Sequence, residues 1–158
     1  MHAVTTLAFV AGLAPSLLTA QGKAPHSVQA RAAPKGVIAV GETVHDALTR
    51  RDPLLPADSA YAQQWRLSGH AGETVTIDLV SDAFDSYVFL LGPGLEREQL
   101  QDDDSGGSCN ARLTARLPQT GDYYVVVTSS DKLRTGAFTL SVTRGAKAKS
   151  LSPCKRDR

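Results

Sequence analysis

Residues 84–107 read FDSYVFLLGPGLEREQLQDDDSGG, and residues 111–128 read ARLTARLPQTGDYYVVVT. Three runs in this stretch are separated by Gly, Pro and Asp: 84–91 and 122–128 are rich in β-branched and aromatic residues, and 112–117 alternates apolar with polar residues. Such runs, bounded by turn residues, indicate short strands. The segment 87–91 is apolar at every position, which predicts a central strand that is covered on both faces.

The alternation of apolar and polar residues continues on both sides of this stretch. In the run 137–143, Phe138, Leu140 and Val142 alternate with threonine and serine. Similar runs occur at 37–44, 62–67 and 73–80. The only helix candidate, 94–102, is too short to be stable alone. The sequence therefore predicts an all-β fold, an antiparallel β-sandwich or jelly roll of seven or eight short strands.

The composition is that of one globular domain with tails. The chain has 158 residues, of which 42% are hydrophobic and 21% are charged, and this is enough to bury a core. A net charge of +1 gives no field that would select nucleic acid as a partner. We expect a signal peptide at 1–20, a flexible leader at 21–35, the β-domain at 36–145 and a basic, solvated tail at 146–158.

The first twenty residues resemble an export signal. A short apolar run at 7–14 is followed by Pro15 and Ser16, and Ala20 is a small residue suited to cleavage. We therefore expect a secreted or periplasmic protein with no integral membrane segment once the signal is removed. The alternative interpretation of residues 3–20 is a retained membrane anchor.

Cysteine usage agrees with export. Cys109 and Cys154 are the only cysteines of the chain, so an oxidising compartment allows one intramolecular disulfide. Closing the loop between them with a disulfide would raise the free energy of unfolding by on the order of 4 kcal/mol in the chain-entropy model. Two unpaired thiols are the alternative.

A series of motifs in a fixed order carries a family resemblance: WRL at 65–67, ETVTIDL at 73–79, FDSYVFLLGP at 84–93, DDDS at 102–105, LPQTGDYY at 117–124 and GAFTL at 136–140. Over residues 36–143 the chain resembles the bacterial pre-peptidase C-terminal domain, a β-sandwich module commonly appended to secreted proteases. The resemblance implies a module without catalytic activity, and a related module in collagenases binds collagen and calcium. Because no peptidase domain precedes the module here, we expect a free-standing binding or accessory protein.

Three consecutive carboxylates, Asp102, Asp103 and Asp104, repel one another unless water or a cation screens them. With Ser105, and with Asp85 from the adjacent strand, they could supply oxygen ligands to calcium. The family resemblance implies that a pair of aspartates ligates calcium in some members, and this pair corresponds to Asp103 and Asp104. A solvated turn rich in Asp, Ser and Gly is the alternative.

The tyrosines are candidate contact residues. Tyr123 and Tyr124 are neighbours on a predicted strand, so their rings point to opposite faces. An exposed ring can contact a protein or a sugar, and the same holds for Tyr61 and Tyr87. Packing within the domain is the alternative for each of them.

The sequence predicts a non-catalytic module that recognises an extracellular protein or a polysaccharide. The alternative is a chaperone or inhibitor of a separately encoded secreted peptidase. The motifs G-x-S-x-G, H-E-x-x-H and C-x-x-C do not occur. A small secreted hydrolase, the third possibility, would depend on His45 or His70.

Overall fold

The computed structural model describes residues 33–107 and 109–151, so the predicted signal peptide, most of the leader and Cys154 lie outside the described residues. The described part contains strands and no helix. The strands are β1 (Gly36–Val37), β2 (Thr43–Leu48), β3 (Leu54–Leu55), β4 (Ala60–Tyr61), β5 (Gln63–Gly69), β6 (Thr74–Val80), β7 (Ser86–Leu91), β8 (Leu100–Asp102), β9 (Ala111–Arg116), β10 (Gly121–Ser129) and β11 (Gly136–Arg144). None of the described residues forms a helix that could cross a membrane.

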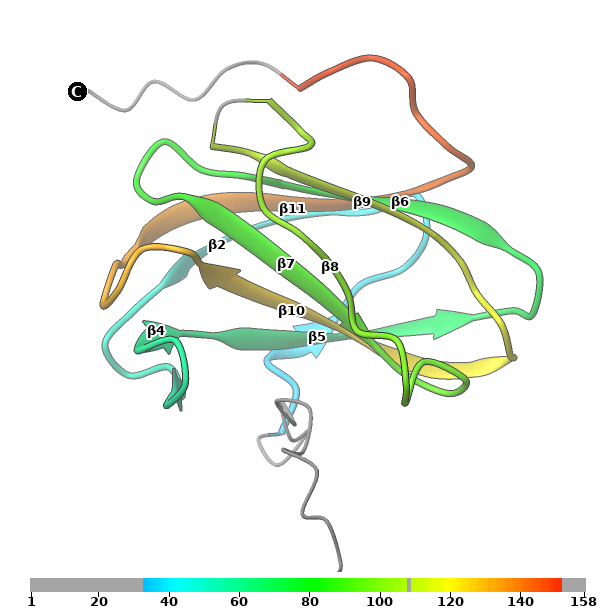
Figure 1. Cartoon of the computed structure of the whole chain (residues 1–158), viewed down its shortest axis with the longest axis horizontal. Helices are drawn as coiled ribbons and strands as arrows, with labels where there is room; N and C mark the ends of the chain where they lie inside the picture. The colour runs from blue at the N-terminus through cyan, green and yellow to red at the C-terminus, as the bar shows by residue number, and fades with distance from the viewer. Residues whose placement is uncertain (1–32, 108, 152–158) are drawn as a thin grey trace, which may run out of the picture.

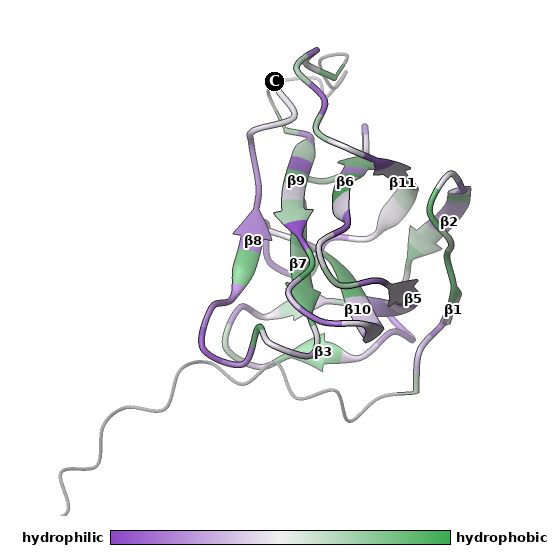
Figure 2. Cartoon of the chain, turned by 90° about the vertical axis from the view of Figure 1, so that its right-hand side faces the viewer, coloured by the Kyte–Doolittle hydropathy of each residue, from purple (hydrophilic) through white to green (hydrophobic). Residues whose placement is uncertain are grey.

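Two sheets pack face to face (Figure 1). The first has the strand order β1-β5-β10-β7-β8, and the second has the order β2-β11-β6-β9. Neighbouring strands are antiparallel except for β1 and β5, which are parallel. The strands β3 and β4 form a separate hairpin, and Figure 2 shows β3 on the outer side of the five-stranded sheet. The predicted all-β sandwich is confirmed.

The core lies between the two sheets and follows the predicted alternation. Val75, Ile77 and Leu79 of β6 are fully buried, and they face Leu67 of β5 in the same cluster. Phe138 of β11 meets Phe84 edge to face, with 6.4 Å between the ring centroids. Inward-facing positions of every long strand therefore build one core, as period-2 sequences should.

Three details differ from the predictions. The expected strand at 37–44 is split, because Gly41 adopts a φ of +98° and Glu42 N–H donates to the carbonyl of Ala39 (3.1 Å) in a turn. The segment 94–102, for which neither a stable helix nor a strand was expected, ends in β8, where half-buried Leu100 packs against the core. The β3–β4 hairpin was not expected at all.

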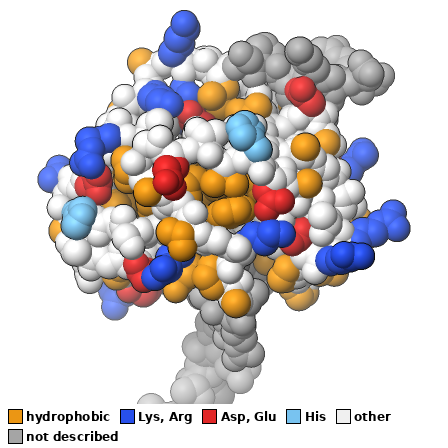
Figure 3. Space-filling view, turned by 180° about the vertical axis from the view of Figure 1, so that it is seen from behind, with side chains coloured by type: hydrophobic (Ala, Val, Ile, Leu, Met, Phe, Trp, Pro, Cys, Tyr) orange, Lys and Arg blue, Asp and Glu red, His pale blue; other side chains and the backbone are white. Residues whose placement is uncertain are grey.

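The sandwich is thinly covered on the side of β1 and β2. Figure 3 views this side, and hydrophobic side chains gather on its surface. Val37 of β1 is 57% exposed, while Val40 and Val44 are half-buried and pack against the core. The cause is the length of β1, which covers two positions of β5 and then ends.

Candidate functional site

The outer face of the five-stranded sheet carries a second apolar cluster. On β7, Val88 and Leu90 enter the core, so Tyr87, Phe89 and Leu91 point outward. We call this surface the tyrosine face; it consists of Tyr87, Phe89, Leu91, Tyr124, Val126, Ala62 and Leu55. Phe89, Val126 and Ala62 are buried on it, while the other four are half-buried. The face therefore presents apolar and aromatic atoms to solvent.

Tyr87 lies at one end of this face, among an aromatic ring and polar side chains. Its ring lies 4.3 Å from the ring of Phe89, centroid to centroid, in a tilted arrangement. Burial raises the pKa of Tyr87 above its ordinary value, and the carboxylates of Asp103 and Asp58 raise it further, while a hydrogen bond with Gln101 opposes them. The surroundings of the phenol thus disfavour its ionised form.

Asp103 reaches Tyr87 because of the register between β7 and β8. Val88 pairs with Asp102, and Phe89 pairs with Gln101. The same antiparallel register, continued by one residue, brings Asp103 opposite Tyr87. The acidic loop therefore begins at the edge of the tyrosine face, which the sequence alone did not indicate.

Asp58 comes from the β3–β4 hairpin, which is fixed beside Tyr87. The hydroxyl of Thr128, the residue that pairs with Tyr87, donates to the carbonyl of Tyr61 (2.8 Å). Leu55 of the hairpin packs into the apolar cluster, and the N–H of Asp58 donates to its carbonyl (3.3 Å). Two chain segments far apart in sequence thus bring their carboxylates to one phenol.

Tyr61 itself lies on the hairpin rather than on the sheet. It is half-buried and pairs with Leu54, whose side chain is 46% exposed. Residues that pair across two strands share one face, so Tyr61 and Leu54 extend the exposed apolar surface beyond the sheet.

The other end of the tyrosine face has balanced charges. Half-buried Tyr124 lies between Leu91 and Arg66 in the sheet. Arg66 pairs with Asp122 at 3.2 Å, and the hydroxyl of Ser68 donates to the same carboxylate at 2.8 Å. The hydrogen bond from Ser68, and then that from Arg66, lower the pKa of Asp122.

Tyr123 has no part in this surface. It is fully buried, and its hydroxyl donates to the carbonyl of Gln119 (2.7 Å) and accepts from the Gln119 N–H (3.2 Å). Gly92 packs against the ring so closely that a Cβ at that position would overlap it. The expectation that the two adjacent tyrosines point to opposite faces is correct, and Tyr123 is the structural one.

The carboxylates of the acidic loop diverge. Oδ1 of Asp102 accepts the backbone N–H groups of Ser105 (3.1 Å) and Arg112 (2.9 Å), so this side chain closes the loop on its own backbone. Asp103 lies near Tyr87, as shown above, and both Asp104 and Ser105 are exposed. Half-buried Asp85 precedes β7, where its carbonyl accepts from Ser130 (3.1 Å).

Among the described residues, no group of three or more His, Cys, Asp or Glu side chains is arranged to hold a metal ion. Calcium binding by the acidic loop stays a prediction. It is checked by thermal unfolding with calcium and with a chelator, because an ion that binds only the native state must raise the Tm.

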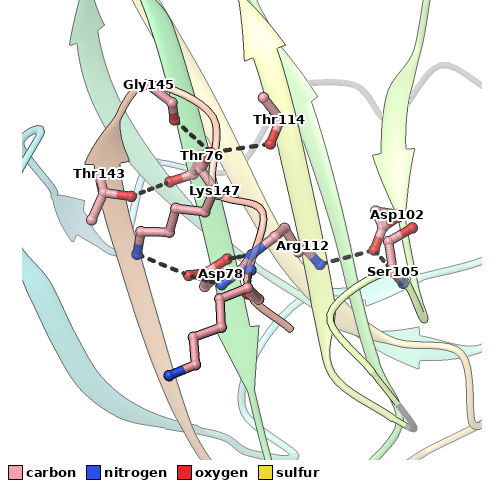
Figure 4. A network of polar contacts seen from close by, with 10 residues as sticks. Thr76, Asp78, Asp102, Ser105, Arg112, Thr114, Thr143, Gly145 and Lys147 are labelled. Carbon is pink, nitrogen blue, oxygen red and sulfur yellow. Dashed lines mark hydrogen bonds and ion pairs between the residues drawn. The ribbon is translucent and has the colours of Figure 1, made fainter. Parts of the chain in front are cut away.

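A buried ion pair on the outer face of the four-stranded sheet was not foreseen (Figure 4). Arg112 of β9 binds Asp78 of β6 through two bonds, Nε to Oδ1 at 2.6 Å and Nη2 to Oδ2 at 2.9 Å. The side chains are 10% and 5% exposed, and the pair raises the pKa of Arg112. Lys147 adds a second cation, 3.3 Å from Oδ2 of Asp78.

The segment 145–151, which we call the C-terminal strap, covers this pair. The N–H of Gly145 donates to the backbone carbonyl of Thr74 (2.7 Å), and the side chain of Arg112 donates to the carbonyl of Lys149. At its end, the N–H of Leu151 donates to the carbonyl of Gly106 (2.8 Å). The described part of the basic tail is therefore bound to the sheet and to the acidic loop. Buried Cys109 follows that loop, while the predicted disulfide partner Cys154 lies outside the described residues.

The two histidines of the hydrolase alternative lie apart. His45 on β2 has its Nδ1 3.0 Å from the hydroxyl of Thr139, and His70 is exposed in the turn after β5. Next to Thr139 is a shallow depression of about 380 Å³ between residues 80–83 and 137–139. Its serine, Ser81, donates to the carbonyl of Ala137 (2.8 Å), so this hydroxyl holds β11 in place.

The sequence matches no protein-family model and no curated protein sequence. Solved structures do resemble the fold. The pre-peptidase C-terminal domain of a collagenase from Bacillus anthracis superposes with a TM-score of 0.54 and 13% identity, over 70% of this chain and 97% of that domain. The periplasmic lysozyme inhibitor PliG of Aeromonas hydrophila, an inhibitor of g-type lysozyme, gives a TM-score of 0.50 and 16% identity, over 72% of this chain and all of that one. The resemblance that the motifs indicated is therefore confirmed at the level of the fold: this chain has the β-sandwich of a pre-peptidase C-terminal domain.

Proposed function

We propose that this chain is an exported, non-catalytic binding module that recognises an extracellular protein through the tyrosine face. The observation that carries the proposal is the row of half-buried Tyr87, Leu91 and Tyr124 on a sheet face that the sandwich does not cover. Tyrosine is enriched among the few residues that carry most of the binding energy at protein interfaces.

Two features support binding over catalysis. The polar groups around the tyrosine face come from rigid strands and a fixed hairpin, which suits a preformed contact surface. The hydroxyls of Ser81, which lines the depression, and of buried Tyr123 both donate to backbone carbonyls and so have structural partners. A polysaccharide could also stack on Tyr87 or Tyr124, and it is the alternative ligand for the same face.

Export follows from the predicted signal peptide at 1–20 and is supported by the fold, which a periplasmic inhibitor shares. We therefore place the protein in the periplasm or outside the cell. Cell fractionation checks this, because an exported chain is recovered in the culture medium or is released by osmotic shock, whereas a chain that is not exported stays in the cytoplasmic fraction.

A second candidate is an inhibitor of a secreted hydrolase. The fold that this chain shares with an inhibitor of g-type lysozyme favours it, since that protein acts by binding another protein. Activity assays of g-type lysozyme and of secreted peptidases, with and without this chain, test the candidate. Inhibition that Tyr87→Ala abolishes would identify the partner and the face together.

The main test is capture from culture supernatant, followed by affinity measurement with the captured partner. Tyr87→Ala and Tyr124→Ala should each weaken binding about 10-fold, as truncation of an interface aromatic does. Val37→Ala is the matched control, because Val37 is 57% exposed and belongs to β1 rather than to the tyrosine face. Equal affinity of all three variants would reject the protein-binding proposal. So would binding of this chain to cellulose, chitin or peptidoglycan without capture of any protein.

A further inference from the structure

Among the described residues, the carboxylates at the Tyr87 end of the tyrosine face form no ion pair. Asp58 and Asp103 are exposed, and none of the ion pairs between described residues includes either of them. At the opposite end, by contrast, Asp122 is neutralised by Arg66. The face is therefore acidic at one end and balanced at the other.

Both acids are held in place by the fold. The β7–β8 register brings Asp103 opposite Tyr87, and the bond from Thr128 fixes the hairpin whose Asp58 raises the pKa of the same phenol. The ring of Tyr87 packs against Phe89 and stays half-buried, so part of it is accessible to a ligand. This end consists of an aromatic ring flanked by two carboxylates.

The polar side chains that act on the Tyr87 phenol are two carboxylates and the amide of Gln101. Gln101 is exposed next to Phe89. A partner that supplies donors and positive charge complements such a surface, since a cation binds favourably both to carboxylates and to the face of an aromatic ring.

We infer that the Tyr87 end of the tyrosine face receives a lysine or arginine side chain of the protein partner, between Asp58 and Asp103. The inference rests on the proposed function and specifies the chemistry of the partner. It excludes an anionic polysaccharide or an acidic protein as the ligand of this end, because either would place like charges against two unpaired carboxylates.

The test uses two peptides of the same shape and different charge, acetyl-Gly-Arg-Gly-amide and acetyl-Gly-citrulline-Gly-amide, in NMR titrations of the full chain. Citrulline keeps the planar group of arginine and removes its charge. The arginine peptide should shift the resonances of Tyr87, Gln101, Asp58 and Asp103, and the citrulline peptide should shift them much less. Shifts of equal size with both peptides, or shifts confined to other surfaces, would overturn the inference.

Charge variants provide the second arm. Asp58→Asn with Asp103→Asn should weaken binding of the arginine peptide about 5-fold, because two exposed ion pairs are lost. Glu42→Gln with Glu98→Gln removes the same charge from other exposed sites and should leave the affinity unchanged. If both double variants behave alike, only the general charge of the protein acts and the inference is wrong.

The captured partner separates this inference from the proposed function. Loss of partner binding in Tyr87→Ala together with full binding in the Asp58→Asn, Asp103→Asn variant would retain the function and reject the basic side chain. Full binding in Tyr87→Ala and Tyr124→Ala would reject the proposed function, whatever the peptides do. A second copy of this chain as the only captured partner would also overturn the inference.

Discussion

Tyr123 and Tyr124 have opposite surroundings, so removal of one oxygen atom should affect them differently. Tyr123→Phe leaves the backbone of Gln119 without the hydroxyl that it contacts twice, which should lower the free energy of unfolding by about 1 kcal/mol. Tyr124→Phe, at a half-buried position, should change it by less than about 0.5 kcal/mol. Urea unfolding of the two variants checks this, and equal effects would contradict the division of roles.

Tyr87 should titrate above the ordinary tyrosine value of 10.0, because burial and two carboxylates oppose its ionisation. Because the pKa of Tyr87 is higher in the folded state than in the unfolded state, ionisation of the phenol lowers the free energy of unfolding. The contribution of Tyr87 to stability is therefore complete below pH 10 and is lost as the pH rises through the folded pKa.

Asp103→Asn and Asp58→Asn should each lower the pKa of Tyr87, whereas Glu42→Gln should not. Titration of ¹³C-labelled tyrosine by NMR measures it. A pKa that none of the variants moves would show that the carboxylates do not lie near the phenol, and this result requires no binding partner.

Among the contacts between strands, we expect the largest loss of stability on replacement of Asp78. Its replacement by Ala leaves Arg112 buried without its anion, which costs about 3–5 kcal/mol. Lys147→Ala removes a side chain that is 38% exposed and should cost no more than about 1 kcal/mol. Urea unfolding compares the two, and a larger loss for Lys147→Ala would mean that the strap rather than the ion pair carries the stability.

The strands that could be predicted are those whose sequence alternates over several residues. In β11, Phe138, Leu140 and Val142 alone indicate the buried face, and the structure agrees. The short strands β3 and β8 hold two or three residues, too few for a period, and they exist because a neighbour supplies their hydrogen bonds. The alternation of apolar and polar residues therefore predicts a strand only where it extends over several residues.

The same limit applies to the site. Opposite orientation of Tyr123 and Tyr124 follows from strand geometry alone. The burial of Asp78 does not, because Arg112 and Lys147 reach it from distant parts of the sequence. Likewise, Asp103 was a candidate through its acidic neighbours, yet its place beside Tyr87 depends on the pairing of β7 with β8.

On the scale of the whole molecule, the strap connects the two layers. It follows β11 of the four-stranded sheet and crosses the Asp78–Arg112 pair (Figures 1 and 4). Its last residue, Leu151, donates to the carbonyl of Gly106 in the acidic loop, which follows β8 of the other sheet. The strap thus holds the loop whose first residues border the tyrosine face. Whatever fixes the end of the strap should also stabilise this part of the binding surface.

We propose that a disulfide between Cys109 and Cys154 provides that fixation, because Leu151 already binds the loop that leads to Cys109. Reduction of the native protein should lower the free energy of unfolding by up to about 4 kcal/mol. Cys154→Ser should reproduce the effect and then respond no further to reductant. Since Gly106 follows Asp103 closely, reduction should also let that carboxylate move away from the phenol and lower the pKa of Tyr87. Unfolding curves that reductant leaves unchanged, or two free thiols by mass spectrometry, would disprove the bridge; a lower stability with an unchanged pKa of Tyr87 would confine its effect to the strap.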